Sequence, residues 1–173
     1  MRSSKGFTLL EVLIVIAIIS IVIAIALPSM QASTQRNRVD TAIAQIQKNL
    51  TFARNHSQNY LKYVTVCPLN NANKCTSDWK IGLDIFIDAD KNLEFNGDDD
   101  DIKLKSGLPF NAQDTIVFTS PLTALTFRPD GQATVSAAPG TEILFRYCSG
   151  EQRSGLKVEN SGITSIVEAA NCS

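Results

Sequence analysis

A single carboxylate stands inside the most apolar part of the chain. Glu11 lies four positions after Phe7, and residues 12–27 contain no charged side chain. An ionisable group in a membrane segment is costly unless it is paired, so Glu11 is a candidate functional residue. The alternative interpretation places Glu11 near the membrane interface, where its side chain reaches water. The two interpretations differ in whether this carboxylate needs a partner.

The densest group of acids, residues 88–101, could bind a cation. The polar side chains at alternate positions are Asp88, Asp90, Asn92 and Glu94. This spacing is typical of the start of a calcium-binding loop, but the glycine that such a loop requires at its sixth position is missing. We therefore interpret the stretch as a solvated loop between two strands. Calcium is the less favoured alternative, and we expect no other cofactor and no firm metal site.

The cysteines indicate an oxidising compartment. The four cysteines are Cys67, Cys75, Cys148 and Cys172, and the only histidine is His56. An even number of cysteines in an exported domain is typical of disulfides, and four cysteines allow three pairings. We favour a Cys67–Cys75 bond, which closes a short loop, and a Cys148–Cys172 bond, which fixes the C-terminus. The alternative, a zinc site, lacks a compact Cys-x-x-Cys pair.

No pattern of catalytic residues stands out. His56 lies near the polar end of a helical segment. We interpret it as an exposed helix residue and not as a general base. No nucleophile motif of the Gly-x-Ser-x-Gly type is present. A net charge of −1 provides no general attraction for nucleic acid. The sequence therefore predicts a protein that is not an enzyme.

The N-terminal segment has the length of a membrane span. Residues 7–28 are apolar apart from Thr8, Glu11 and Ser20, and a helix crosses the bilayer core with about 20 residues. Arg2 and Lys5 precede the span, and no charge follows it before Arg36. By the positive-inside rule the N-terminus stays in the cytoplasm. The rest of the chain is expected in the periplasm, anchored by a single pass through the inner membrane.

A second helical pattern follows at residues 29–59. Apolar residues recur there every three or four positions, which places them on one face of a helix. That face consists of Val39, Ala42, Ile43, Ile46, Leu50 and Ala53. Pro28 lies between the two helical segments, and proline lacks the N–H that a continuous helix uses. The sequence leaves two alternatives, one long helix bent near Pro28 or a membrane helix that ends there.

Residues 60–173 change to an extended pattern and form a β-rich globular domain. Short runs with alternating apolar residues are separated by turn signals such as PDGQ and APGT. One run alternates Ile81, Leu83, Ile85 and Ile87. Trp79 and Phe86 are expected in the core. Many short strands after one long helix predict an α+β fold, with the amphipathic face packed on an antiparallel sheet.

The segment KGFTLLEVLIVIAIISIVIAIALPS resembles the N-terminal signature of type IV pilins and type II secretion pseudopilins. A short basic leader, residues 1–6, ends at Gly6, and Phe7 and Glu11 then take the first and fifth positions of the mature chain. The resemblance implies cleavage between Gly6 and Phe7 by the prepilin peptidase, followed by methylation of the new amine. It also implies that Glu11 pairs with the Phe7 amine of a neighbouring subunit during assembly.

Three further segments are similar to the FimT/FimU/GspH branch of this family: NLTFARNHSQNYLKYVTVCP, DWKIGLDIFIDADKN and LTFRPDGQA. The resemblance implies a type IV pilin fold, other major and minor pilins as partners, and a minor pilin that helps start or cap a type IV pilus. The first alternative is a GspH-type minor pseudopilin of a type II secretion system. The second is a DNA-uptake pilin, but Ile163 and Ser165 replace the arginines of the basic motif associated with that function, so nucleic acid is not an expected partner.

Overall fold

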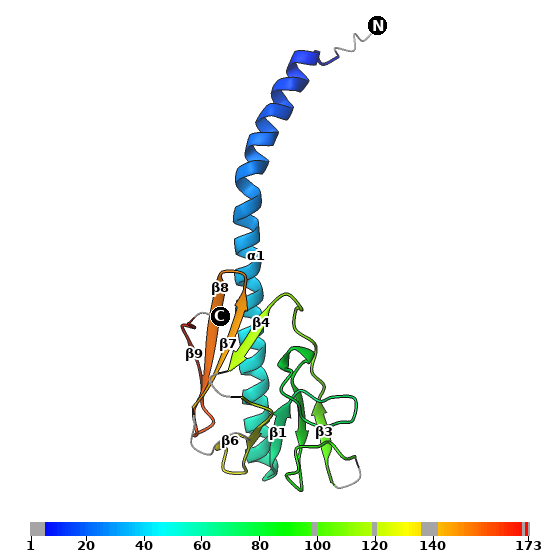
Figure 1. Ribbon diagram of the computed structural model, residues 1–173, viewed down its shortest axis with the longest axis vertical. Helices are drawn as coiled ribbons and strands as arrows, with labels where there is room; N and C mark the ends of the chain where they lie inside the picture. The colour runs from blue at the N-terminus through cyan, green and yellow to red at the C-terminus, as the bar shows by residue number, and fades with distance from the viewer. Residues whose placement is uncertain (1–5, 98–99, 119–120, 136–141, 171, 173) are drawn as a thin grey trace.

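The computed structural model describes residues 6–97, 100–118, 121–135, 142–170 and 172 (Figure 1). One long helix, α1 (Leu9–Tyr60), carries a β-rich domain on its C-terminal half, and its N-terminal half projects away from that domain. Arg2 and Lys5, on which the expected orientation depends, lie outside the described residues. The predicted α+β class is confirmed.

α1 begins and ends with well-formed caps. Thr8 has an extended backbone, and its side chain accepts a hydrogen bond from the Glu11 amide. At the other end, Leu61 adopts a left-handed conformation, and its amide donates to the Ser57 carbonyl. Such caps satisfy backbone groups that have no partner inside the helix.

The helix continues through Pro28, so the alternative that the helix ends there is wrong. A proline inside a helix removes one hydrogen bond and costs about 3 kcal/mol. Unbroken helical turns on both sides of Pro28 outweigh that local loss, because each added residue contributes its own backbone bond. The N-terminal half curves relative to the half that contacts the domain (Figure 1).

Two antiparallel sheets form the domain, whereas the sequence suggested one. The first has the order β3-β2-β1-β5-β6 and the second the order β4-β7-β8-β9. The strands of the first sheet are β1 (Val64–Cys67), β2 (Asp84–Ile87), β3 (Ile102–Lys105), β5 (Leu125–Phe127) and β6 (Ala133–Val135). Those of the second are β4 (Thr115–Phe118), β7 (Ile143–Ser149), β8 (Gln152–Val158) and β9 (Thr164–Val167).

The apolar face of α1 forms the core with both sheets. It contacts β1, β2 and β5 of the first sheet and β7, β8 and β9 of the second. All six residues of the predicted face are buried: Val39, Ala42, Ile43, Ile46, Leu50 and Ala53. Trp79 and Phe86 are buried as expected, and Trp79 Nε1 donates to the Leu122 carbonyl at 2.7 Å.

The predicted strand around residue 85 begins later than its apolar alternation suggests. Leu83, Ile85 and Ile87 are buried, but Ile81 is exposed and belongs to a short 3-10 helix, η1 (Trp79–Ile81). Asp78 caps η1 by accepting a hydrogen bond from the Lys80 amide, and this local bonding competes with strand formation. The predicted PDGQ turn does join β5 to β6, with Gly131 at φ 79°.

Candidate functional site

The first turn of α1 holds the residues predicted to act in processing and assembly. Phe7 is 82% exposed and lies just before the Thr8 cap. The Glu11 amide donates to Thr8 Oγ1 at 3.3 Å, so Glu11 occupies the third helical position. Thr-x-x-Glu is the sequence of a capping box, and a carboxylate in the first turn is also favoured by the helix dipole. The Thr8 cap and the place of Glu11 in its first turn were visible in the sequence and were missed.

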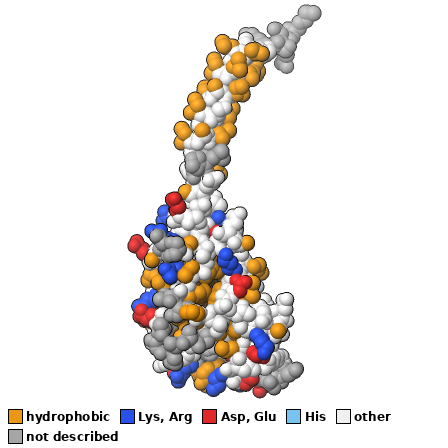
Figure 2. Space-filling model, viewed as in Figure 1, with side chains coloured by type: hydrophobic (Ala, Val, Ile, Leu, Met, Phe, Trp, Pro, Cys, Tyr) orange, Lys and Arg blue, Asp and Glu red, His pale blue; other side chains and the backbone are white. Residues whose placement is uncertain are grey.

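The projecting half of α1 is an uncovered apolar surface. Its side chains from Phe7 to Ile25 are exposed, and Figure 2 shows hydrophobic side chains along the visible face of this half of the helix, beyond the domain that carries the charged residues. Among the described residues, α1 is the helix that is long and apolar enough to cross a membrane. A surface of this size is stable only against lipid or other apolar helices.

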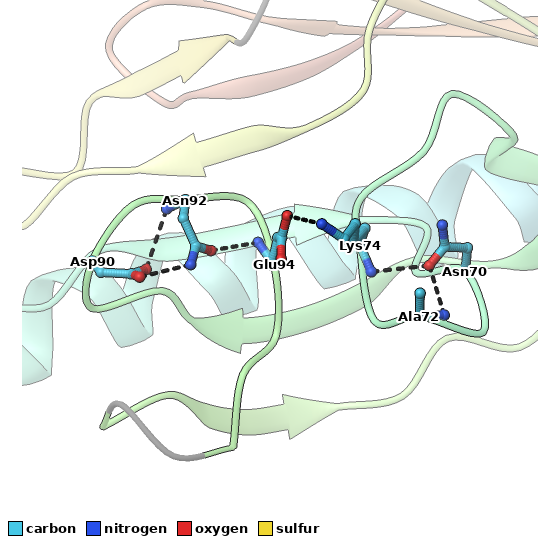
Figure 3. A network of polar contacts seen from close by, with 6 residues as sticks. All are labelled: Asn70, Ala72, Lys74, Asp90, Asn92 and Glu94. Carbon is cyan, nitrogen blue, oxygen red and sulfur yellow. Dashed lines mark hydrogen bonds and ion pairs between the residues drawn. The ribbon is translucent and has the colours of Figure 1, made fainter.

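The predicted acidic loop is closed by its own hydrogen bonds. Asp90 accepts from both the amide and the side chain of Asn92, and the Asn92 side-chain oxygen accepts from the Glu94 amide at 2.7 Å (Figure 3). The Glu94 carboxylate does not face Asp90 but forms an ion pair with Lys74. The structure therefore directs the Glu94 carboxylate to Lys74, while the Asn92 side chain bonds to Asp90 and to the Glu94 amide.

A different set of carboxylates comes together beside this loop. Asp88, Asp90 and Asp101 each place one oxygen within 4.8 Å of the others. Asp101 was missed in the sequence because it is separated from Asp88 by a loop. All six oxygens of the set already accept hydrogen bonds, for example from Thr65 Oγ1 to Asp88 at 2.8 Å and from the Ala89 amide to Asp101 at 2.9 Å. Oxygen ligands suit calcium, but these bonds also explain the loop without a cation.

Burial raises the pKa of the Asp88 carboxyl above its ordinary value, and the nearby Asp101 and Asp90 carboxylates act in the same direction. The hydrogen bond from Thr65 opposes this shift. A cation near these three groups would lower the same pKa, because it would stabilise the charged form.

The acidic stretch and the loop that contains Asn70 and Lys74 form one surface. Lys74 links them through its ion pair with Glu94, and the Cys75 amide donates to the Leu93 carbonyl at 3.0 Å. Within its own loop, Asn70 accepts from the amides of Ala72 and Lys74 (Figure 3). The two loops therefore present a fixed polar surface.

The disulfides are Cys67–Cys75 and Cys148–Cys172, the two pairings that the sequence analysis favoured. They consume all four cysteines, so the zinc alternative is wrong. The first bond fixes the loop that carries Asn70 and Lys74 to the end of β1. The second attaches the C-terminal segment to β7.

His56 is not the exposed residue that the sequence suggested. It lies between Phe52 and Tyr60 on one side of α1, with ring centroids 4.4 Å and 5.1 Å away. Spacing of four residues places such side chains one above the other on a helix, so this signal was present in the sequence. Among the described residues, the ring of His56 contacts these two aromatic side chains, and it serves in packing.

A buried polar network connects α1 to the second sheet, and the sequence analysis did not find it. Tyr147 Oη donates to Asp114 Oδ2 at 2.8 Å, and Arg38 Nη2 lies 3.6 Å from Asp114 Oδ1. Asp114 is only 2% exposed. Burial raises the pKa of the Tyr147 phenol, and the hydrogen bond to Asp114 raises it further. The three residues come from distant parts of the chain, so no local pattern announces them.

The region considered for DNA contact has mixed charge. Lys157 Nζ lies 2.8 Å from Glu142 and 3.6 Å from Glu159. Ile163, which stands in place of a basic residue, is 52% exposed, and Ser165 is also exposed. Phosphate binding needs clustered positive charge that is free to contact the backbone. This surface does not provide it at the positions that the family comparison singled out.

Comparisons with known proteins agree with this geometry. Residues 42–162 match the family described as type II transport protein GspH, and residues 1–27 match the prokaryotic N-terminal methylation motif. A fimbrial protein of Pseudomonas aeruginosa is 45% identical over 53 residues, which is 31% of this chain and 34% of that protein. The sequence match thus spans about a third of this relative's length.

Two kinds of solved structure share the fold. The type IV minor pilin FimU of Pseudomonas aeruginosa aligns with a TM-score of 0.59 and 22% identity, covering 78% of this chain and 91% of that one. The minor pseudopilin EpsH from the type 2 secretion system of Vibrio cholerae aligns with a TM-score of 0.51 and 9% identity, covering 76% and 97%. With the helix, the methylation motif and the family match over most of its length, the chain belongs to the GspH family of pilin-like proteins, the class of minor pilins and pseudopilins.

Proposed function

We propose that the chain is a minor pilin that helps to start or cap a type IV pilus. The observation that carries the proposal is the uncovered apolar half of α1, which is continuous with a disulfide-bonded domain. In a bundle of such helices, neighbouring subunits would cover this surface and present their domains on the outside. The sequence match to a fimbrial protein supports a pilus as the assembly.

Processing is proposed between Gly6 and Phe7. The cut would leave Phe7 and Thr8 ahead of the helix, with the new amine on the exposed Phe7. In an apolar helix bundle, the Glu11 carboxylate of one subunit would pair with the Phe7 amine of its neighbour, and a low dielectric constant strengthens such a pair. Mass spectrometry of the mature chain tests this proposal. A methylated Phe7 terminus supports it, and a terminus near Ala32 without the apolar segment contradicts it.

The domain is proposed to face the periplasm before assembly. Two disulfides support an oxidising compartment, since such bonds persist outside the cytoplasm. The single apolar span would hold the chain in the inner membrane until it joins the filament. Protease added to spheroplasts should digest the domain, whereas protection of the domain would reverse the orientation.

A GspH-type pseudopilin is the second candidate, and the family match itself favours it. The two candidates act in different machines, so deletion of the gene distinguishes them. We expect loss of twitching motility with normal release of exoproteins. Loss of exoprotein release with intact pili would favour the secretion system.

DNA uptake is not the function that we propose. The ion pairs of Lys157 with Glu142 and Glu159 neutralise positive charge near β9. A gel shift with the purified full chain in detergent should show weak binding that disappears at physiological salt, as expected for nonspecific contacts. Tight binding at that salt concentration would contradict this view.

A further inference from the structure

The edges of the two sheets differ in how they are protected. An edge strand exposes unpaired N–H and C=O groups, and proteins normally cover or charge it. In the first sheet, β3 carries Lys103 and Lys105, and β6 meets the turn before β9, where the Ala133 amide donates to the Asn160 carbonyl at 3.0 Å. In the second sheet, β4 contacts η1. Three of the four edges in the described part of the chain are therefore covered or charged.

β9 is the remaining edge. α1 contacts this strand as it contacts β7 and β8, but β9 itself carries no charged residue. Its sequence is Thr-Ser-Ile-Val, with no charge and no proline, and no described strand pairs with its outer side. Ile166 is 58% exposed, although the register pairs it with Leu156, which is fully buried. Ile163, just before the strand, is 52% exposed. An uncharged, β-branched edge flanked by two exposed isoleucines is suited to strand addition.

The register shows which backbone groups face outward. The Glu159 amide donates to the Ile163 carbonyl at 3.0 Å, so this pair is hydrogen-bonded across the turn. Hydrogen-bonded and open pairs alternate in an antiparallel ladder. Ser165 and Val167 therefore direct their backbone groups to β8, and Thr164 and Ile166 direct theirs to the open edge.

We propose that the edge of β9 binds an extended strand of a different pilin-like subunit. This inference rests on the proposed function, because it requires a filament in which domains lie side by side. The added strand would bond to Thr164 and Ile166 and would place an apolar side chain over the exposed part of Ile166. Glu168 follows β9 and is exposed, so a basic residue on the incoming strand would complement it.

Antiparallel pairing of β9 with the β9 of a second copy does not fit. Antiparallel pairing of β9 with itself requires a two-fold axis across the strand, as in an isologous interface. The strands of the second sheet run roughly along α1, so that axis would point the two apolar helix halves in opposite directions (Figure 1). Both halves could not then enter one membrane or one bundle of parallel helices.

Photo-crosslinking in assembled filaments tests the interface. In one variant of the full chain, a photoreactive amino acid replaces Ile166. In a second variant the same amino acid replaces Leu13 and reports the packing of the helix. Peptide mapping by mass spectrometry then identifies the partner segment. We expect crosslinks from Ile166 to an edge strand of another pilin-like subunit, and crosslinks from Leu13 to apolar helices.

Matched variants connect the crosslink to backbone pairing. Thr164→Pro removes an outward N–H, whereas Thr164→Val keeps it and has nearly the same shape. We expect the yield from Ile166 to fall about fivefold or more in the proline variant and to stay unchanged in the valine variant. Ser165→Lys provides a second disruption, by charge, if the proline variant has a lower unfolding midpoint.

The outcomes separate the two proposals. Two results would overturn the proposed interface alone, both with normal crosslinks from Leu13. In the first, Ile166 forms no crosslink; in the second, Ile166 crosslinks only to lipid or to a second copy of this chain. Equal yields in Thr164→Pro and Thr164→Val filaments, with Ser165→Lys also unaffected, overturn it as well. Absence of the chain from filaments, together with absence of Leu13 crosslinks, overturns the proposed function and the interface with it.

Discussion

Replacing Tyr147 by phenylalanine should loosen the attachment of α1 to the second sheet. The substitution removes only the hydroxyl that donates to Asp114 Oδ2 at 2.8 Å, and the ring can keep its contact with Phe110, whose centroid is 5.7 Å away. A hydrogen bond to a charged partner contributes about 1.5–3 kcal/mol. Because Asp114 is 2% exposed, water cannot easily replace the lost donor. We therefore expect Tyr147→Phe to lower the free energy of unfolding by about 2 kcal/mol.

Urea unfolding of the full chain in detergent measures this change. Trp79 is the only tryptophan and is buried against Phe145, so its fluorescence reports the folded domain. In a thermal scan, about 2 kcal/mol corresponds to a midpoint lower by about 4–8 °C for a domain of this size. Tyr60→Phe is a matched control, because Tyr60 is 63% exposed and its change should stay within about 0.5 kcal/mol.

A double-mutant cycle decides whether the hydrogen bond is the cause. Asp114→Ala removes the acceptor, and Arg38, whose side chain is 31% exposed, can then turn to water. If the bond matters, Tyr147→Phe should cost less than about 0.5 kcal/mol in the Asp114→Ala background. An equal cost in both backgrounds would refute the reasoning and assign the effect to packing.

The other predictions concern the acidic loop, the second disulfide and the core. Asp88 has a raised pKa, so its stabilising contribution is complete below its ordinary value of 3.8 and is lost as pH rises through the folded-state pKa. In Asp88→Asn the free energy of unfolding should therefore change less with pH than in the wild type. An equally steep dependence on pH in both proteins would contradict this prediction. The unfolding midpoint of the wild type should be the same in calcium as in a chelator. A higher midpoint in calcium that Asp88→Asn abolishes would indicate a bound cation. Replacing both Cys148 and Cys172 by alanine should cost about 3.5 kcal/mol for their separation of 24 residues, measured in urea. Leu50→Ala should cost about 2–5 kcal/mol in the same assay, because Leu50 is fully buried.

Sequence periodicity predicted the parts of the fold that depend on local pattern. The face from Val39 to Ala53 follows the helical repeat, and every member is buried. Short alternating runs gave the strands, except where the polar bonding of Asp78 started a 3-10 helix instead. Division into two sheets was not predictable, because it depends on pairings between strands far apart in the chain, such as β1 with β5.

Some features of the candidate sites follow from local sequence, and others depend on the folded arrangement of distant segments. The disulfide pairing of Cys67 with Cys75 followed from a short loop, and the capping position of Glu11 was readable from Thr8 three residues earlier. Asp101 joins Asp88 only after β2 and β3 have paired. The Arg38–Asp114–Tyr147 network needs the helix, a loop and β7 in their final places. Spacing alone carries no signal for such contacts.

Glu11 has two possible roles, one in the first turn of its own helix and one in a charge pair with a neighbouring subunit. Replacement by glutamine distinguishes these roles. Its amide bonds to Thr8, and its first-turn carboxylate faces the positive end of the helix dipole. The Phe7 amine would lie at that same positive end, where it gains nothing from its own helix, so a carboxylate from another subunit is its better partner.

Glutamine is accepted at this position of a capping box but carries no charge. Glu11→Gln should therefore keep helix formation and cleavage after Gly6 while incorporation into filaments falls. Thr8→Val should do the reverse, weakening the cap by about 1 kcal/mol while incorporation continues. Filament incorporation is measured by quantitative mass spectrometry of sheared pili, normalised to the processed chain in the membrane. Normal incorporation of Glu11→Gln would show that the charge pair proposed for assembly is not needed.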